Sequence, residues 1–130
     1  MKDYDKKYSI NVTQYKILVT VSELNKKSLY PSLKGLRNIL SGSDDKETVK
    51  YRDISTYSSL ISVQKRTLAS IVLMLVRSEF LTYKYDPKSD DMYLMITIKG
   101  NESIYDFKKH HKVSLISKEK TLRDEIVRIE

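Results

Sequence analysis

Apolar residues recur with the period of an amphipathic helix in the first third of the chain. The first such segment can be N-capped by Asn11 or Thr13, and its apolar face is formed by Val12, Ile17, Leu18, Val21 and Leu24. After a polar break at 25–28, Pro31 stands where a first helical turn tolerates it, and Gly42 ends a second segment. The apolar positions of this second segment are Leu33, Leu36, Ile39 and Leu40. The pattern predicts two consecutive helices.

The longest periodic segment runs from Ser62 to Glu79 and predicts a central helix. Its apolar stripe is formed by Leu68, Ile71, Val72, Leu75 and Val76. It follows a polar loop at 43–50 and the stretch 51–60, whose composition indicates an irregular turn or a single helical turn.

After this helix the period changes from 3.6 to 2, which is typical of strands. Leu81, Tyr83 and Tyr85 alternate with polar residues, and from Leu94 to Ile98 the alternation resumes. The residues between them, 87–90, have turn chemistry, so we expect a β-hairpin with a projecting, mobile tip and with Tyr83 in the core.

The remaining residues complete the predicted organisation. We expect a short helix at 102–109 and an amphipathic helix at 117–129. The chain then divides into a flexible segment 1–10, a domain 11–110 and a C-terminal helix in 111–130 that packs on the domain or forms a dimer. The order of elements predicts an α+β, mainly α fold: a winged helix, with a helix-turn-helix core, a two-stranded wing and C-terminal helices.

Composition narrows the class of function. The 130 residues suffice for one domain, and they include no cysteine, no bilayer-length apolar run and no secretory signal, so we expect a cytoplasmic protein, nucleoid-associated if bacterial. No residue pattern indicates a metal site, a cofactor or a catalytic group. The net charge of +7, with its excess in the first half, favours either a polyanionic partner or an inert basic surface.

Several stretches, in this order, resemble the RQC domain of RecQ-type DNA helicases. They are VTQYKILVTVSEL (12–24), LKGLRNILSGS (33–43), DISTYSSL (53–60), LMLVRSEFL (73–81) and LMITIKG (94–100). The sequence departs from the family at Ser41, where arginine is preferred, at Leu68, where an aromatic residue is common, and at Ser58 and Glu79, where the family prefers glycine. No four-cysteine zinc module is present, and glycines at 35, 42 and 100 alone cannot form an ATP-binding phosphate loop.

The resemblance implies a non-catalytic module that binds duplex or fork DNA, beside a helicase motor in cis or in trans, in replication or repair. In the family, the wing separates strands by stacking an aromatic residue on the terminal base pair. Tyr85 and Tyr93 bracket the expected tip, and they either stack on DNA or pair across the hairpin and stiffen it.

Candidate phosphate contacts come from basic and hydroxyl side chains. Lys65 and Arg66 occupy the first turn of the central helix, where free amides favour an anion. The other candidates are Lys34, Arg37, Arg52, Ser55, Thr56, Lys84 and Lys88. The alternative for each is solvated surface, and Asp86, Asp90 and Asp91 oppose a deeply inserted wing.

Two other classes remain open. A winged-helix transcription regulator of the MarR or SarA kind would bind duplex DNA as a dimer, using residues 117–130 as its seam. A winged helix that binds protein alone would carry an apolar patch on the central helix in place of Lys65 and Arg66. Neither class requires a membrane.

Overall fold

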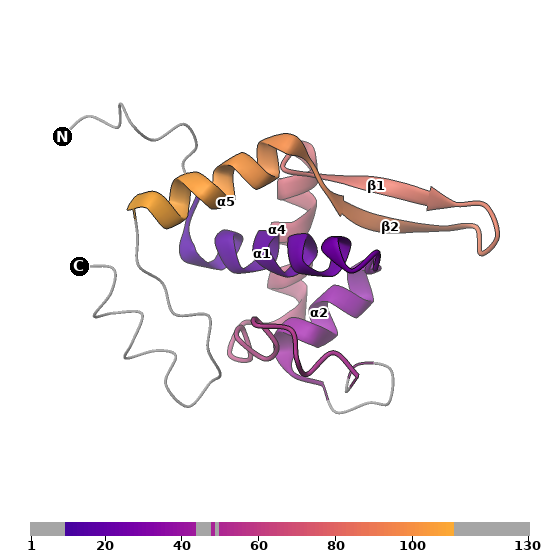
Figure 1. Ribbon diagram of the computed structural model, residues 1–130. Helices are drawn as coiled ribbons and strands as arrows, with labels where there is room; N and C mark the ends of the chain where they lie inside the picture. Colours follow the sequence, from indigo (N-terminus) through magenta and orange to yellow (C-terminus); the bar gives the residue numbers. More distant parts are fainter. Residues whose placement is uncertain (1–9, 44–47, 49, 111–130) are drawn as a thin grey trace.

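The computed structural model describes residues 10–43, 48 and 50–110, which form an α+β, mainly helical arrangement (Figure 1). Its elements are α1 (Val12–Lys26), α2 (Leu33–Ser41), α4 (Lys65–Arg77), β1 (Leu81–Asp86), β2 (Asp91–Ile96) and α5 (Ile98–His110). The predictions for residues 1–9, most of the 43–50 loop and the helix at 117–129 lie outside the described residues. None of the described helices is long and apolar enough to cross a bilayer.

Helix α1 lies at the centre of the core. Helix α5 runs beside it, α4 crosses behind it, and α2 lies below its C-terminal half in the view of Figure 1. The buried apolar side chains that join these helices include Ile17, Leu18, Val21, Leu36, Leu40, Leu68, Val72 and Leu75. The rings of Tyr15 and Phe107 stack with centroids 4.5 Å apart and fasten α5 to α1.

The ends of the first two helices follow from local hydrogen bonding. Asn11, one of the two predicted N-cap residues, caps α1 through a capping box with Gln14. Ser32 caps α2, and Gly42 ends it in the left-handed conformation at φ 72°. Pro31 therefore precedes the cap instead of occupying the first turn of α2, and its carbonyl oxygen accepts a hydrogen bond from the Leu94 N–H at 2.8 Å.

The segment 50–62 consists of successive turns, as predicted, and it delays the start of α4 to Lys65. Its Ser58 has φ 58° and packs so closely on α2 that a Cβ at Gly42 would lie 2.5 Å from the Ser58 Cβ. At the other end of α4, Glu79 has φ 70° in the turn that leads into β1. Both non-glycine residues thus adopt a conformation that glycine favours.

The hairpin is antiparallel and pairs Leu81 with Ile96 and Tyr83 with Leu94, which confirms the predicted alternation. At its base Leu81 and Leu94 are buried in the core, while the outer part projects beyond the helices (Figure 1). Tyr83 is 39% exposed, so its predicted place in the core is wrong: it lies on the core-facing side of the hairpin but past the end of the core.

Helix α5 starts immediately after β2, four residues earlier than predicted. The Thr97 hydroxyl accepts a hydrogen bond from the Gly100 N–H at 2.9 Å, as an N-cap does. The same hydroxyl lies 2.7 Å from the Glu79 carbonyl oxygen, to which it donates. Gly100 is buried against Phe80 and Ile96, where a Cβ has no room. The Thr-x-x-Gly sequence therefore joins the end of α4 to the start of α5.

Candidate nucleic-acid interface

The first turn of α4 is an exposed, positively charged helix end. Gln64 at the N-cap makes no side-chain capping bond, the turn contains no acidic residue, and Lys65 and Arg66 are both exposed. At the starts of α1, α2 and α5, by contrast, a backbone N–H donates a hydrogen bond to a side-chain oxygen. Two cations beside the positive end of a helix dipole repel it, and a bound anion would relieve that repulsion.

The rest of the exposed face of α4 is mixed in character. Arg77 and Ser70 are exposed, and so are Leu73 (41%) and Met74 (48%). These residues lie off the predicted apolar stripe, and their exposure follows from that placement. The face therefore combines cations at both ends with an apolar centre.

The two hydroxyl candidates in the 50–62 turns, Ser55 and Thr56, are both hydrogen-bonded to α1. Thr56 is fully buried, and its hydroxyl is hydrogen-bonded to the Thr20 hydroxyl of α1. Ser55 is exposed, but its N–H and hydroxyl donate to the Glu23 carboxylate at 2.8 and 2.6 Å. These residues fasten the turns to α1, so we remove them from the phosphate contacts.

The remaining candidates on the helical body are dispersed. Arg52 is exposed on the turns, and Lys34 is exposed in the first turn of α2. Arg37 is half-buried, and its Nε atom is buried with no hydrogen-bond partner. Lys34 is thus better placed than Arg37 to meet a phosphate.

Lys84 and Tyr93 stand directly opposite each other on β1 and β2 and therefore share one face of the hairpin. The Lys84 ammonium lies 4.5 Å from the ring centroid of Tyr30, in the linker between α1 and α2. Tyr93 is half-buried and lines a cavity together with Tyr30. This face of the hairpin thus carries a cation beside an aromatic ring and continues onto the helical body, and its last pair towards the tip is Asp86 and Asp91.

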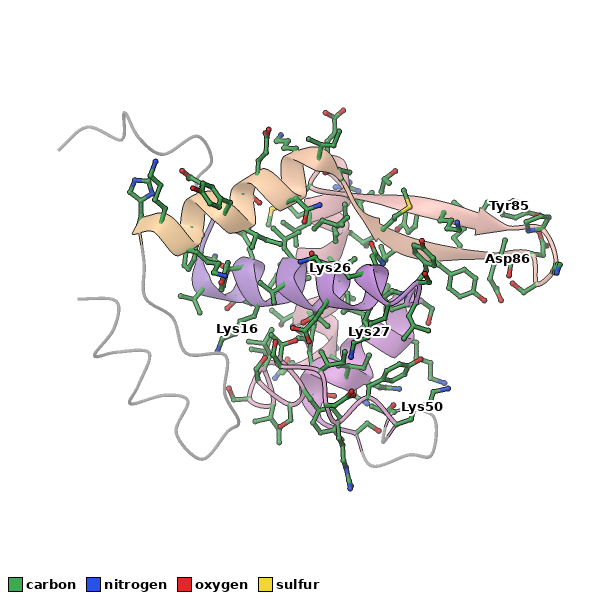
Figure 2. All side chains as sticks on the ribbon, in the orientation of Figure 1. Lys16, Lys26, Lys27, Lys50, Tyr85 and Asp86 are labelled. Atoms are coloured by element: carbon green, nitrogen blue, oxygen red, sulfur yellow. The ribbon has the colours of Figure 1, made fainter. Side chains whose placement is uncertain are left out.

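Tyr85 lies on the opposite face, 53% exposed, near the far end of the hairpin (Figure 2). Its hydroxyl donates to the Asp90 carboxylate at 2.6 Å, and this hydrogen bond, with a smaller contribution from burial, raises the pKa of Tyr85. The residues opposite Tyr85 and Tyr93 are Met92 and Lys84, so the two tyrosines are not cross-strand aromatic partners.

Hydrogen bonds to carboxylates hold the tip of the hairpin together. Asp86 accepts from the Lys88 N–H at 3.0 Å and from the Ser89 hydroxyl at 3.1 Å. The Asp90 carboxylate accepts a hydrogen bond from the Tyr85 hydroxyl, and the Asp91 carboxylate lies 3.5 Å from the Tyr93 hydroxyl. With Lys88 as its cation, the tip is acidic overall.

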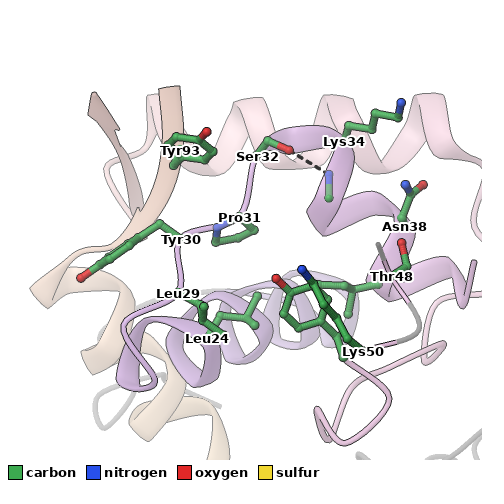
Figure 3. Close-up of a pocket in the computed structure, with 13 residues that line it drawn as sticks. Leu24, Leu29, Tyr30, Pro31, Ser32, Lys34, Asn38, Thr48, Lys50 and Tyr93 are labelled. Carbon is green, nitrogen blue, oxygen red and sulfur yellow. Dashed lines mark hydrogen bonds between the residues drawn. The ribbon is translucent and has the colours of Figure 1, made fainter. Parts of the chain in front are cut away.

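A cavity of about 410 Å³ opens between α2, the α1–α2 linker, the start of the turns and β2 (Figure 3). Its aromatic side chains are Tyr30, Tyr51 and Tyr93, and its polar ones include Lys34, Asn38 and Lys50. A smaller hollow next to it shares Leu29, Lys50 and Tyr51 and adds Lys27, whose ammonium lies 3.4 Å from the Asp53 carboxylate. Sequence reasoning missed this cavity because its walls come from segments far apart in the chain.

Lys16 is the one lysine in the core of the described part of the chain (Figure 2). Burial lowers its pKa to about 8, as burial raises the pKa of the neighbouring Tyr15 to about 12. Neither group reaches the surface. Among the described residues, no group of three or more His, Cys, Asp or Glu side chains could hold a metal ion.

No protein-family model matches the chain, and a comparison with curated proteins gives no match.

Proposed function

We propose that the chain is a non-catalytic, DNA-binding winged-helix module similar to the RQC domain. In this assignment α1, α2 and α4 form the helix-turn-helix core, α4 is the helix that precedes the wing, and β1–β2 is the wing. The order of elements and the projection of the hairpin from the end of α4 support the assignment. A helicase motor, in cis or in trans, is the proposed partner.

Backbone geometry supports the resemblance at two of the four positions where the sequence departs from the family. The family prefers glycine where this chain has Ser58 and Glu79, and both residues have positive φ. A backbone conformation that glycine adopts most readily is thus retained although the residue differs. Gly100, at the end of the LMITIKG stretch, fills a position where no side chain fits.

The observation that carries the DNA-binding proposal is the first turn of α4. It offers free amides, Lys65 and Arg66 on an exposed, uncapped helix end, in a chain with a net charge of +7. In a nucleic acid, the anions that such a surface can bind are the backbone phosphates. These contacts would position the protein on a duplex without reading its sequence.

The wing would meet DNA with a face instead of its tip. Asp86, Asp90 and Asp91 at the tip repel phosphates, whereas Lys84 and Tyr93 present a cation and a ring side by side. Strand separation would then use the Tyr93 face, because a tyrosine ring can stack on an exposed base.

Charge reversal tests the proposal. We expect Lys65→Glu/Arg66→Glu to weaken binding of a blunt duplex at least tenfold and to reduce the slope of log affinity against log salt by about two. Fluorescence anisotropy over a salt series measures both. Lys108→Glu/Lys109→Glu, which reverses an exposed basic pair in the last turn of α5, is the matched control. Equal losses in the two double variants would show that overall charge, and not α4, binds the DNA.

One observation favours the second candidate, a dimeric regulator of the MarR or SarA kind. Ile98 and Tyr105 stand seven residues apart on one side of α5 and are 80% and 71% exposed. An exposed apolar pair of this kind suits a helix-mediated dimer. Sedimentation at several concentrations distinguishes the candidates: we expect a monomer, and a dimer disrupted by Tyr105→Lys would support the regulator.

A further inference from the structure

The cavity beside Tyr93 brings together three tyrosines from three segments of the chain. Tyr30 comes from the α1–α2 linker, Tyr51 from the turns and Tyr93 from β2. Leu24, Leu29 and Ile39 supply its apolar wall. Flat rings over an apolar wall suit a flat aromatic ligand, because base–aromatic stacking depends on the π-face and not on base identity.

A buried amide gives the cavity a polar group. Asn38 on α2 is only 9% exposed, lines the cavity, and its side-chain amide makes no hydrogen bond to the other described residues (Figure 3). An asparagine amide offers both a donor and an acceptor, which is the combination that reads the edge of a base. Because this amide lines the cavity, a ligand there that pairs with Asn38 gains affinity.

Cations surround the same opening. Lys34 and Lys50 line it, and the Lys84 ammonium lies over the Tyr30 ring. The Lys50 ammonium lies 5.3 Å from the centroid of Tyr51. Tyr30 and Tyr51 thus each have a cation beside them, so a phosphate attached to a base stacked there would find a positive group within reach.

We propose that this cavity holds one unpaired nucleotide of a DNA end or fork, with its base against the tyrosines and Asn38 and its phosphate at the lysines. The volume of about 410 Å³ falls in the range of small-ligand sites, about 300–1,000 Å³. The inference rests on the proposed function and adds a single-strand site to duplex binding. The site lies on the Lys84–Tyr93 face of the hairpin, so a strand parted there enters it.

The test compares a blunt duplex with the same duplex carrying a short single-stranded overhang. The first unpaired position of the overhang holds a fluorescent adenine analogue whose emission falls on stacking. We expect the overhang to bind about tenfold more tightly than the blunt duplex and its emission to be quenched. Tyr93→Ala should abolish both effects. Tyr85→Ala, which removes a tyrosine from the opposite face of the same hairpin, is the matched control and should abolish neither.

A second variant keeps the test decisive if Tyr93→Ala does not fold. Lys34→Glu changes an exposed residue in the first turn of α2, where an acidic side chain suits the helix dipole, and it should also remove the preference for the overhang. Equal affinity for both DNAs in the unmodified protein would overturn the nucleotide site while duplex binding stands. Failure to bind either DNA would overturn the proposed function and the site that rests on it.

Discussion

The two ends of the hairpin are held by different forces. At the base Leu81 and Leu94 are each 1% exposed, and the N–H groups of Leu94 and Ile96 donate to the Pro31 carbonyl and the Asn25 side chain, both at 2.8 Å. At the tip the side chains are mostly exposed, and the hydrogen bonds join residues within five positions of each other.

This difference separates the part of the hairpin that stabilises the fold from the part that does not. The base is fixed by burial and by contacts with α1 and the α1–α2 linker, so its residues belong to the folding unit. The tip depends on its own turn chemistry, so its residues can change with little effect on the rest of the molecule. Substitutions along one hairpin should therefore fall into two groups.

The largest expected effect is at the base. Leu94→Ala removes a fully buried side chain and should lower the free energy of unfolding by about 3 kcal/mol, measured by urea denaturation. Tyr83→Ala is the control, because Tyr83 stands directly opposite Leu94 but is 39% exposed. A loss at Tyr83 as large as at Leu94 would show that burial does not distinguish the base.

A smaller loss is expected where the base meets α5. An alanine Cβ at Gly100 would lie 2.8 Å from the Ile96 Cδ1 and closer still to the Phe80 carbonyl oxygen, so Gly100→Ala should cost about 2 kcal/mol. Gly35→Ala is the control of opposite sign. In the first turn of α2, an alanine Cβ at position 35 would contact only the Ser32 Oγ, at 3.3 Å. This substitution should raise the free energy of unfolding by about 0.5 kcal/mol. Thermal denaturation of both variants measures the contrast, and a destabilised Gly35→Ala would contradict it.

The sequence was sufficient to predict the regular elements. The apolar period predicted α1 and α2, and the alternation of 81–85 and 94–96 predicted the hairpin. The extension of the second strand to Ile98 is wrong, because β2 ends at Ile96 and Ile98 begins α5. Local capping chemistry also predicted helix ends, such as the Asn11 cap of α1 and the end of α2 at Gly42. These features depend on residues close together in the chain, which is why a single sequence reveals them.

Features that join distant segments were missed. Thr56 was expected at the surface because it is a polar residue in a turn, yet it is buried through a hydroxyl pair with Thr20, which lies 36 positions away. Tyr83 follows the apolar alternation, but only the length of the core decides where that face becomes exposed. The cavity tyrosines have no local signal, because only the fold brings them together.

The turn at the tip should contribute less than either base position. Asp86→Ala removes the acceptor of the Lys88 N–H and the Ser89 hydroxyl and should lower the free energy of unfolding by about 1 kcal/mol. Chemical denaturation of Lys88→Ala provides the control, since the backbone donor of Lys88 is retained and stability should not change. If Asp86→Ala were as damaging as Leu94→Ala, the tip would belong to the folding unit and the division of the hairpin would fail.

The smallest effect is a change in proton affinity at Tyr85. The hydrogen bond that its hydroxyl donates to the Asp90 carboxylate holds the pKa of Tyr85 above its ordinary value of 10.0. Because the protonated phenol is favoured in the folded state, its contribution to stability is complete below pH 10 and is lost as the pH rises through the folded pKa. The absorbance titration of the protein minus that of Tyr85→Phe isolates this group, and Asp90→Asn should move its pKa back towards 10. An unchanged titration in Asp90→Asn would mean that the Asp90 carboxylate does not raise the pKa of Tyr85. In alkaline solution a deprotonated Tyr85 would add a further negative charge to a tip that already contains three aspartates, and the hydrogen bond to Asp90 opposes this deprotonation.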